Sequence, residues 1–182
     1  MIIFGLGNPG DEYLMSRHNL GFMVVDALAH NLGLRFKPSG DALVAKGSCS
    51  NQNLHLVKPL TYMNRSGRVV KDVLADNKDD FLVVVDDVDL EFSRLRLRKQ
   101  GGTSGHNGLE SIAERLDTEE FPRLRLGIGP RPDGAELSDY VLQRFSADEL
   151  ENLKDLISRA ADACLLVLEK GIDNAMNEVN PE

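Results

Sequence analysis

The chain has 182 residues, of which 42% are hydrophobic and 27% are charged, so its length and composition fit one globular domain and exclude a disordered or fibrous protein. The formal net charge of −8 argues against a protein that coats nucleic acid nonspecifically, because an acidic surface repels phosphates. Any contact with nucleic acid must therefore use a local basic patch.

Membrane, secretion and metal signals are absent from the sequence. No apolar run approaches the roughly 18 residues that a membrane span needs, and Met1 leads directly into Ile2-Ile3-Phe4 without a basic signal-peptide start. We therefore expect a cytoplasmic protein without membrane contact. Cys49 and Cys164 lie far apart and outside any zinc-ligand spacing, so we expect both to be reduced and Cys164 to be buried.

The first half of the chain alternates predicted strands and helices. A buried strand over 1–6 is followed by a polar loop and by a helix over 20–32, whose apolar residues recur at helical spacing. Short strands over 42–48 and 54–57 then precede a helix over 66–74.

A central strand and two basic strands are predicted next. The continuous apolar run over 81–85 is typical of a strand covered on both faces, and it ends in acidic residues that indicate a site. Strands over 94–98 and 123–128 alternate basic or small residues with Leu or Ile, and a helix over 109–116 separates them.

A long amphipathic helix over 147–169 is predicted near the end of the chain, followed by the stop signal Gly171 and a short helix over 172–179. Strands that alternate with helices imply an α/β fold. We expect a single domain over 1–182, with a central twisted mixed β-sheet and helices packed on both faces. Ligands in such folds usually bind beyond the strand ends.

The segment Gly5-Leu6-Gly7-Asn8-Pro9-Gly10 matches the dinucleotide-binding pattern GxGxxG and follows a predicted strand. Its context does not fit, because a Rossmann turn enters a helix at once, whereas Asp11-Glu12-Tyr13 continues as loop. We therefore expect no cofactor. The glycines are interpreted as a tight turn that lets the backbone approach a ligand, with Asn8 projecting from it.

His18 is the candidate general base, because it ends the same loop and a neutral imidazole titrates near neutral pH. The segment Asp86-Asp87-Val88-Asp89-Leu90 supplies candidate acids, one of which could bind one imidazole nitrogen and leave the other free to accept a proton. The alternatives are a solvated acidic loop and a cation site. No EF-hand spacing follows, so we expect no metal.

Asn64 and Asn107 each precede a predicted helix, and capping of that helix is the simplest interpretation of both. The glycine-containing stretch 101–105 gives Asn107 a second interpretation, because it forms a mobile or ligand-binding loop before a helix N-terminus. A phosphate or a carbonyl oxygen could bind there.

Basic side chains line one face of two predicted strands, with leucines on the opposite face. Alternating charge on an exposed strand is often only a solvated face, but two such stripes in an acidic protein favour phosphate binding. They consist of Arg94, Arg96, Arg98 and Lys99 in the first stripe and Arg123 and Arg125 in the second.

Five segments, taken together and in order, resemble bacterial-type peptidyl-tRNA hydrolases, and they span most of the chain. The first joins the glycine turn and Tyr13 to Arg17-His18-Asn19-Leu20-Gly21. The others are Lys58-Pro59-Leu60-Thr61-Tyr62-Met63-Asn64-Arg65-Ser66-Gly67, Asp86-Asp87-Val88-Asp89-Leu90, Gly105-His106-Asn107-Gly108-Leu109 and Arg123-Leu124-Arg125-Leu126-Gly127-Ile128-Gly129.

That resemblance implies hydrolysis of the ester between peptide and tRNA, with His18 as base and Asp89 as the acid that orients it. It implies neither metal nor cofactor, and a monomer as the family's usual state. The substrate-binding residues would be Asn8, Tyr13, Met63, Asn64 and Asn107. The residues binding tRNA phosphates would be Arg96, Arg98, Lys99 and Arg125, of which Arg98 and Arg125 correspond to the family's phosphate clamp.

Two positions depart from the family pattern, since Ser93 and Ser104 stand where the family commonly has Gly. If either must adopt a positive φ, its side chain carries a backbone penalty. Two other functions stay open. A noncatalytic RNA-binding protein on the same fold would use the basic stripes alone, and an esterase for small substrates would not need them.

Overall fold

A seven-stranded mixed sheet forms the centre of the computed structural model, which describes residues 1–77 and 79–181. The strand order is β2-β3-β4-β1-β5-β7-β6. Strands β4, β1, β5 and β7 run parallel, whereas β2, β3 and β6 pair antiparallel with their neighbours. The strands are β1 (Ile2–Gly5), β2 (Lys37–Ser39), β3 (Ala42–Cys49), β4 (Gln52–Pro59), β5 (Phe81–Glu91), β6 (Leu95–Arg98) and β7 (Arg123–Gly129).

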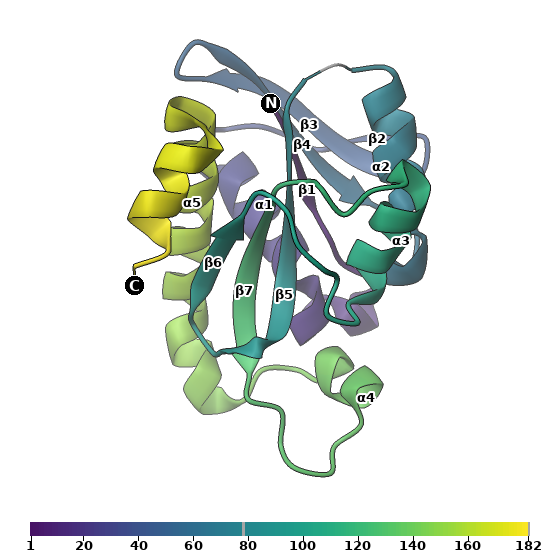
Figure 1. The fold of residues 1–182 in the computed structure, drawn as a ribbon, viewed down its shortest axis with the longest axis vertical. Coiled ribbons are helices and arrows are strands. Elements are labelled where there is room, and N and C mark those ends of the chain that lie inside the picture. The colour runs from purple at the N-terminus through teal and green to yellow at the C-terminus, as the bar shows by residue number, and fades with distance from the viewer. Residues whose placement is uncertain (78, 182) are drawn as a thin grey trace.

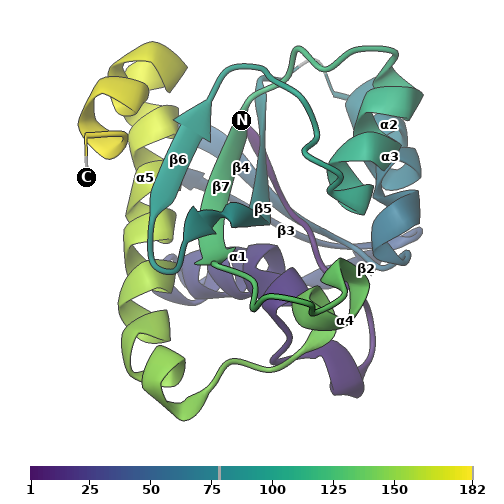
Figure 2. The ribbon, with the colours of Figure 1, turned by 60° about the horizontal axis from the view of Figure 1, so that its bottom comes forward.

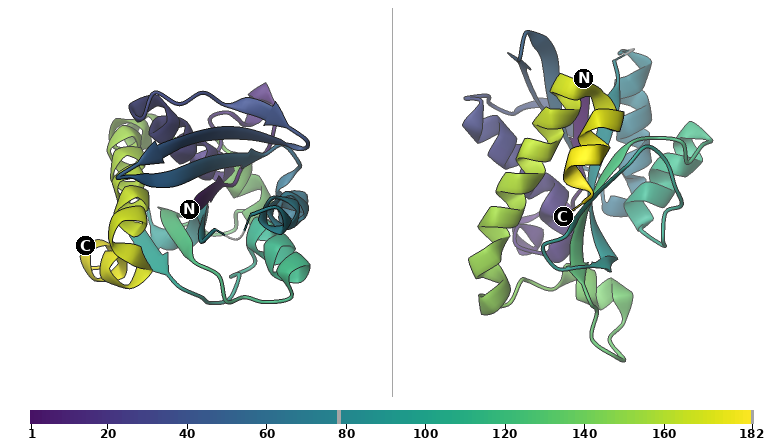
Figure 3. Two further views of the ribbon diagram at one scale, coloured as in Figure 1. Left: turned by 90° about the horizontal axis from the view of Figure 1, so that it is seen from above. Right: turned by 60° about the vertical axis from the view of Figure 1, so that its left-hand side comes forward.

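Helices cover both faces of this sheet, as the sequence predicts (Figures 1 and 3). One apolar cluster joins α1 and α5 to one face, and a second joins α2 and α3 to the other. The helices are α1 (Leu20–Asn31), α2 (Ser66–Ala75), α3 (Asn107–Leu116), α4 (Leu137–Leu142) and α5 (Ala147–Val179), with 3-10 turns η1 (Asp11–Tyr13), η2 (Arg17–Asn19) and η3 (Met63–Arg65).

The central strand β5 shows why the sheet lies between two helical layers. Leu82 and Val84 belong to the cluster that contains α1, whereas Val83 and Val85 belong to the cluster that contains α2 and α3. Successive side chains of a strand point to opposite faces, so a strand buried on both sides needs a continuous apolar run. The run over 81–85 meets that requirement.

The strand itself is longer than this run, because β7 continues to pair with β5 through Asp86 and Asp87 and again at Glu91. The predicted elements otherwise agree with the structure to within about two residues at most ends, the usual uncertainty of such bounds. The break predicted at Gly171 is confirmed, since its φ of 77° interrupts the helical backbone of α5. Strand β2 and helix α4 were not predicted.

The two serines that replace glycines both adopt a positive φ, 72° at Ser93 and 51° at Ser104. Each is held by an arginine. Arg159 donates to the carbonyl and hydroxyl oxygens of Ser93, both at 2.7 Å, and Arg125 donates to the hydroxyl of Ser104 at 2.9 Å. These bonds offset part of the backbone penalty that a non-glycine residue carries in this region.

The two edges of the sheet differ. At one edge β2 is three residues long and contains Lys37 and Pro38. At the other, Asn180 binds the backbone of β6 at both polar groups of Leu97. The Leu97 N–H donates to Asn180 Oδ1 at 2.8 Å, and Asn180 Nδ2 donates to the Leu97 carbonyl at 3.0 Å.

Two further expectations can be compared with the structure. Cys164 is buried, as predicted, and Cys49 is half-buried, and both are free thiols. Among the described residues, no helix combines the length and the apolar character needed to cross a lipid bilayer.

Candidate active site

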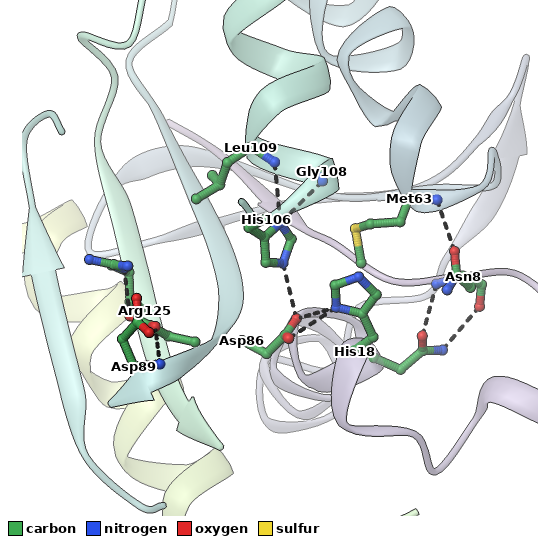
Figure 4. A network of polar contacts seen from close by, with 11 residues as sticks. Asn8, His18, Met63, Asp86, Asp89, His106, Gly108, Leu109 and Arg125 are labelled. Carbon is green, nitrogen blue, oxygen red and sulfur yellow. Dashed lines mark hydrogen bonds and ion pairs between the residues drawn. The ribbon is translucent and has the colours of Figure 1, made fainter. Parts of the chain in front are cut away.

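His18 lies in η2, directly before α1, and only 5% of it is exposed. Its Nδ1 is 2.9 Å from Asp86 Oδ1 and 3.0 Å from Asp86 Oδ2 (Figure 4). A carboxylate only accepts hydrogen bonds, so Nδ1 carries the proton and Nε2 holds the free lone pair of a neutral ring. This tautomer can take a proton from a bound molecule.

Asp86, rather than the predicted Asp89, is the acid that contacts His18. Strand alternation places Asp86 on the same face of β5 as Val84, which is the face that α1 covers. Asp89 lies three residues further along, with an exposed side chain, and its backbone N–H donates to Asp87 Oδ1 at 2.9 Å. The predicted contact between Asp89 and His18 is therefore not present in the structure.

The charges of this pair stabilise each other in a buried place. Burial of Asp86 disfavours its carboxylate, but His18 and His106 outweigh that effect and hold the pKa of Asp86 well below its usual range. Burial likewise disfavours the His18 imidazolium, but the charge of Asp86 and its hydrogen bond raise the pKa of His18 above the ordinary 6.5. Asp86 thus stays ionised while His18 titrates.

His106 reaches the same carboxylate from the opposite helical layer. It is the N-cap of α3, where its Nδ1 accepts from the backbone N–H groups of Gly108 at 3.1 Å and Leu109 at 3.2 Å. Its Nε2 is 3.1 Å from Asp86 Oδ1. Asp86 is therefore shared between two imidazoles, whose ring centroids are 4.8 Å apart.

Asn8 is fixed beside His18 by three hydrogen bonds. Its Oδ1 accepts from the Met63 N–H at 2.8 Å, while its backbone N–H and carbonyl bind the carboxamide of Asn19 at 2.8 and 3.0 Å. Since the side-chain oxygen is occupied, the Asn8 amide NH₂ is the group left to donate to a ligand. Asn8 and Met63 lie on the side of His18 away from Arg125 (Figure 4).

The glycine turn supports close packing of β1 against α1. A Cβ on Gly5 would lie 2.2 Å from the carbonyl oxygen of Gly21, and one on Gly7 would lie 2.7 Å from the ring of Phe22. These glycines are therefore required because α1 packs directly against them. The sequence interpretation, in which they let the backbone approach a ligand, did not include this reason. The close contact holds Asn8 against the segment that carries His18.

A cavity of about 280 Å³ opens beside His18 and Asp86. Leu137 and Val141 of α4 line it with apolar side chains. Figure 2 shows α4 below β5 and β7. The other lining residues include Asn107, the 103–106 loop and Arg125, beside the apolar Val88 and Leu109. A substrate group that reaches His18 through this cavity would therefore meet apolar, polar and cationic side chains.

Comparison with known proteins agrees with this geometry. Residues 2–182 match the sequence pattern of the family described as Peptidyl-tRNA hydrolase. The chain belongs to the peptidyl-tRNA hydrolase family.

Individual relatives match along nearly their whole length. The peptidyl-tRNA hydrolase of Chloroflexus aurantiacus is 46% identical over 99% of this chain and 98% of its own length. That of Fervidobacterium nodosum is 43% identical over 99% and 96%. The crystal structure of the Acinetobacter baumannii peptidyl-tRNA hydrolase superposes with a TM-score of 0.92 at 33% identity, covering 98% of this chain and 93% of that one.

Not all residues that the family resemblance predicts to bind substrate line the cavity beside His18. Asn107 lines it, and Asn8 and Met63 lie beside His18. Asn64 is exposed and lines a separate hollow of about 520 Å³ together with Tyr62. Tyr13 lies half-buried in η1 and is not among the residues that line either space.

The basic stripes of this family member divide into structural and available arginines. The antiparallel register sets Arg96 beside Arg125 and Arg98 beside Arg123, so all four share one face of β6 and β7. Arg123 is buried, and its guanidinium donates to the carbonyl groups of Gly101, Gly102, Glu119 and Phe121. It therefore holds a loop and is not available to phosphate.

The other basic residues are open to solvent to different degrees. Arg98 and Lys99 are exposed and Arg96 is half-buried, although Lys99 forms an ion pair with Asp173 at 2.5 Å. Arg125 lies 2.6 Å from the buried Asp87. Arg125 is thus fixed at the cavity, but part of its charge is already neutralised.

Sequence patterns missed the contacts that hold α4 and α5 beside His18. The buried Arg17 forms two hydrogen bonds with Glu149, at 2.6 and 2.8 Å, and its guanidinium lies 4.6 Å from the Tyr140 ring centroid. Ser146-Ala147-Asp148-Glu149 has the spacing of a capping box, which is present at the start of α5. That spacing could have identified Glu149 as a capping residue. No local pattern identifies Arg17 as its partner, because the two residues lie far apart in the sequence.

One group of three possible metal ligands occurs among the described residues, namely His18, Asp86 and His106. Their ligand atoms lie within 4.8 Å of one another. His18 Nδ1 carries a proton toward Asp86, and so does His106 Nε2, because His106 Nδ1 accepts two backbone N–H groups. A metal ligand must instead offer a lone pair. A cation would have to displace both protons.

Proposed function

We propose that this protein hydrolyses the ester that joins the peptide to the tRNA in peptidyl-tRNA, with His18 as the general base. The observation that carries this proposal is the His18–Asp86 pair, in which Nδ1 is bound by a buried carboxylate and Nε2 is free beside a cavity. Membership of the family supports the substrate. The products are free peptide and reusable tRNA, as in ribosome rescue.

In the proposed reaction, His18 Nε2 removes a proton from water, and the resulting hydroxide attacks the ester carbonyl carbon. Asp86 stabilises the imidazolium that forms, in the role that was expected of Asp89. Collapse of the tetrahedral intermediate breaks the bond to the ribose oxygen, and the imidazolium returns its proton to that oxygen. The protein's own residues can carry each of these steps.

The Asn8 amide is the candidate donor to the developing oxyanion, because its oxygen is held by Met63 N–H and its NH₂ is available. One such donor contributes roughly 3–4 kcal/mol to the transition state. Asn107 would contact the tRNA end or the attacking water from the cavity wall. Asn64 and Tyr13 would bind parts of the substrate further from the ester.

Arg96, Arg98, Lys99 and Arg125 are proposed to bind phosphates of the tRNA acceptor arm. They extend from the cavity across β6 and β7, so a strand of RNA whose end lies at His18 would pass over them. Since peptidyl-tRNA is a product of the ribosome, we propose that the protein acts in the cytoplasm. We also propose that it acts as a monomer, without metal or cofactor.

The test is release of peptide from an N-blocked aminoacyl-tRNA by the wild type, by His18→Ala and by His30→Ala. His30 is exposed at the end of α1, so its replacement controls for loss of a histidine. We expect His18→Ala to reduce turnover by at least about 100-fold, the lower range for a lost general base. Tight tRNA binding without release by the wild type would instead favour the noncatalytic RNA-binding protein.

A further inference from the structure

His106 is an unusual residue for the position that it occupies. Helix N-caps are usually Ser, Thr, Asp or Asn, whose short side chains accept from the backbone N–H groups of the first turn. His106 accepts from two such groups, at Gly108 and Leu109. An Asn would satisfy the same donors through its Oδ1, so capping alone does not account for a longer ring.

The other end of the ring supplies the additional role. Because Nδ1 accepts two backbone N–H groups, it carries no proton, and a neutral His106 must therefore be protonated on Nε2. That nitrogen lies 3.1 Å from Asp86 Oδ1. The helix start thus selects the tautomer that donates to the buried acid.

We propose that His106 is a positioning residue for hydrolysis, which sets the proton affinity of His18 by sharing Asp86 with it. The inference rests on the proposed function, because it concerns the same base. The contacts form one continuous chain of hydrogen bonds. The first turn of α3 fixes His106, His106 binds Asp86, and Asp86 binds His18. The three residues come from three separate elements and converge at one carboxylate (Figure 4).

The direction of the effect follows from how hydrogen bonds share a charge. A carboxylate that accepts from two rings stabilises an imidazolium less than one that accepts from a single ring. His106 therefore restrains the rise that Asp86 causes in the pKa of His18 and keeps the neutral form populated near neutral pH. It also fixes the Asp86 carboxylate, and hence the direction of His18 Nε2.

Other charged groups near the pair are accounted for by their own partners. Asp87, the neighbour of Asp86 on β5, lies 2.6 Å from Arg125 of β7. Arg17, which precedes His18, binds Glu149 of α5. These ion pairs stay in place when His106 changes, so the response of His18 reports the bond between His106 and Asp86.

The experiment is an NMR titration of the imidazole resonances in the free protein, with His18 assigned from the spectrum of His18→Ala. The chain has four histidines, so the signals can be separated. In His106→Asn the cap is retained, but the side chain is too short to reach Asp86. We expect the His18 midpoint to rise by about one pH unit. An unchanged or lower midpoint would overturn the proposal.

His106→Gln is the conservative variant, because its Nε2 can occupy the place of the histidine Nε2 and donate to Asp86. We expect its His18 midpoint to lie close to that of the wild type. A midpoint as high as in His106→Asn would show that the donated hydrogen bond is not the cause, and the proposal would fail. Thermal unfolding of both variants checks that α3 remains folded.

The pH dependence of kcat gives a second readout. For His106→Asn, the limb on which activity rises with pH should move upward with the His18 midpoint, with the plateau lowered by about tenfold because Asp86 is less well fixed. If the free-enzyme midpoint does not move but hydrolysis is normal, this inference fails and the proposed function stands. If neither the wild type nor any variant hydrolyses the ester, the proposed function fails. The titration still tests whether the bond between His106 and Asp86 sets the pKa of His18.

Discussion

Asp86 is 3% exposed, so the protein must replace the water that would otherwise stabilise its charge. His18 and His106 do so with hydrogen bonds to its oxygens. The raised pKa of His18 has opposite consequences for activity and stability. A base acts when neutral, so activity rises as pH passes through that pKa. The stability that His18 gains from its charged form is complete below about 6.5 and is lost as pH rises through the raised pKa, whereas the stability from the lowered pKa of Asp86 is lost only in acid.

The roles of the two acids can be separated by Asp86→Asn and Asp89→Asn. Removing the charge of Asp86 should lower kcat by about 1,000-fold, because His18 loses its orientation and the imidazolium its counter-charge. The remaining activity should rise at lower pH than in the wild type, since the pKa of His18 falls. A kcat–pH profile of each variant is the measurement.

Asp89→Asn is the matched control, with the same chemical change three residues away on an exposed side chain. Its profile should overlay that of the wild type. If Asp89→Asn instead reproduces the loss, the original prediction from family resemblance was right and the assignment to Asp86 is wrong.

At the scale of secondary structure, periodicity predicted most of the fold because most elements bury one regular face. The sheet order and the pairing of β1 with both β4 and β5 are long-range features that no local pattern carries. Strand β2 was missed because three residues that include Pro38 give no alternation. Helix α4 was missed because its six residues span fewer than two turns.

Candidate site residues could be predicted where a local pattern marks them. They could not be predicted where the answer depends on which face of a strand a residue occupies. His18 and Asn8 stand out because an imidazole and a glycine-flanked amide follow one strand. The choice between Asp86 and Asp89 requires knowing that β5 continues past Val85 and which face each acid takes. Only pairing with β7 determines that continuation, and β7 begins more than thirty residues later.

The crossing of α2 and α3 gives a test of packing at the element scale. A Cβ on Gly67 would lie 1.9 Å from the backbone carbonyl oxygen of Ser111, which cannot move without α3. Overpacking costs on the order of 1–3 kcal/mol, and the gain of up to about 1 kcal/mol from removing a helical glycine does not offset it here. We expect Gly67→Ala to lower the free energy of unfolding by about 2 kcal/mol in urea denaturation.

Gly102→Ala is the control for this substitution, because a Cβ at that position meets nothing within 4 Å and the backbone does not require glycine. Its free energy of unfolding should stay within about 0.5 kcal/mol of the wild type. Equal losses in the two variants would mean that the contact with Ser111 is not the reason for Gly67.

For the molecule as a whole, charge is unevenly distributed: a net charge of −8 coexists with a basic face on β6 and β7. Under the proposed function, this distribution favours approach of the RNA to the basic face, since a net negative charge repels phosphates elsewhere. The basic residues of this face, Arg96, Arg98 and Arg125, were predicted from the sequence. The sequence did not show that Arg123, in the same strands, binds the carbonyl groups of a loop instead.

The salt dependence of turnover measures the contribution of the basic face. Arg98→Gln should raise KM and reduce the slope of log(kcat/KM) against log[salt] by about 1, with kcat little changed, because one phosphate contact is lost. Lys154→Gln removes an exposed charge on α5, outside this face, and should leave the slope unchanged. An unaltered slope for Arg98→Gln would remove that residue from the RNA path.

The bond between Asn180 and Leu97 also bears on how copies of the protein behave toward one another. An open sheet edge is a template on which another chain can add a strand, and with it a route to aggregation. Here one edge already has its Leu97 groups occupied by the side chain of Asn180, and the other is too short and too rich in Pro and Lys to serve. Both edges therefore offer a poor template for a strand from another copy, which lowers the tendency of the folded protein to aggregate through its sheet.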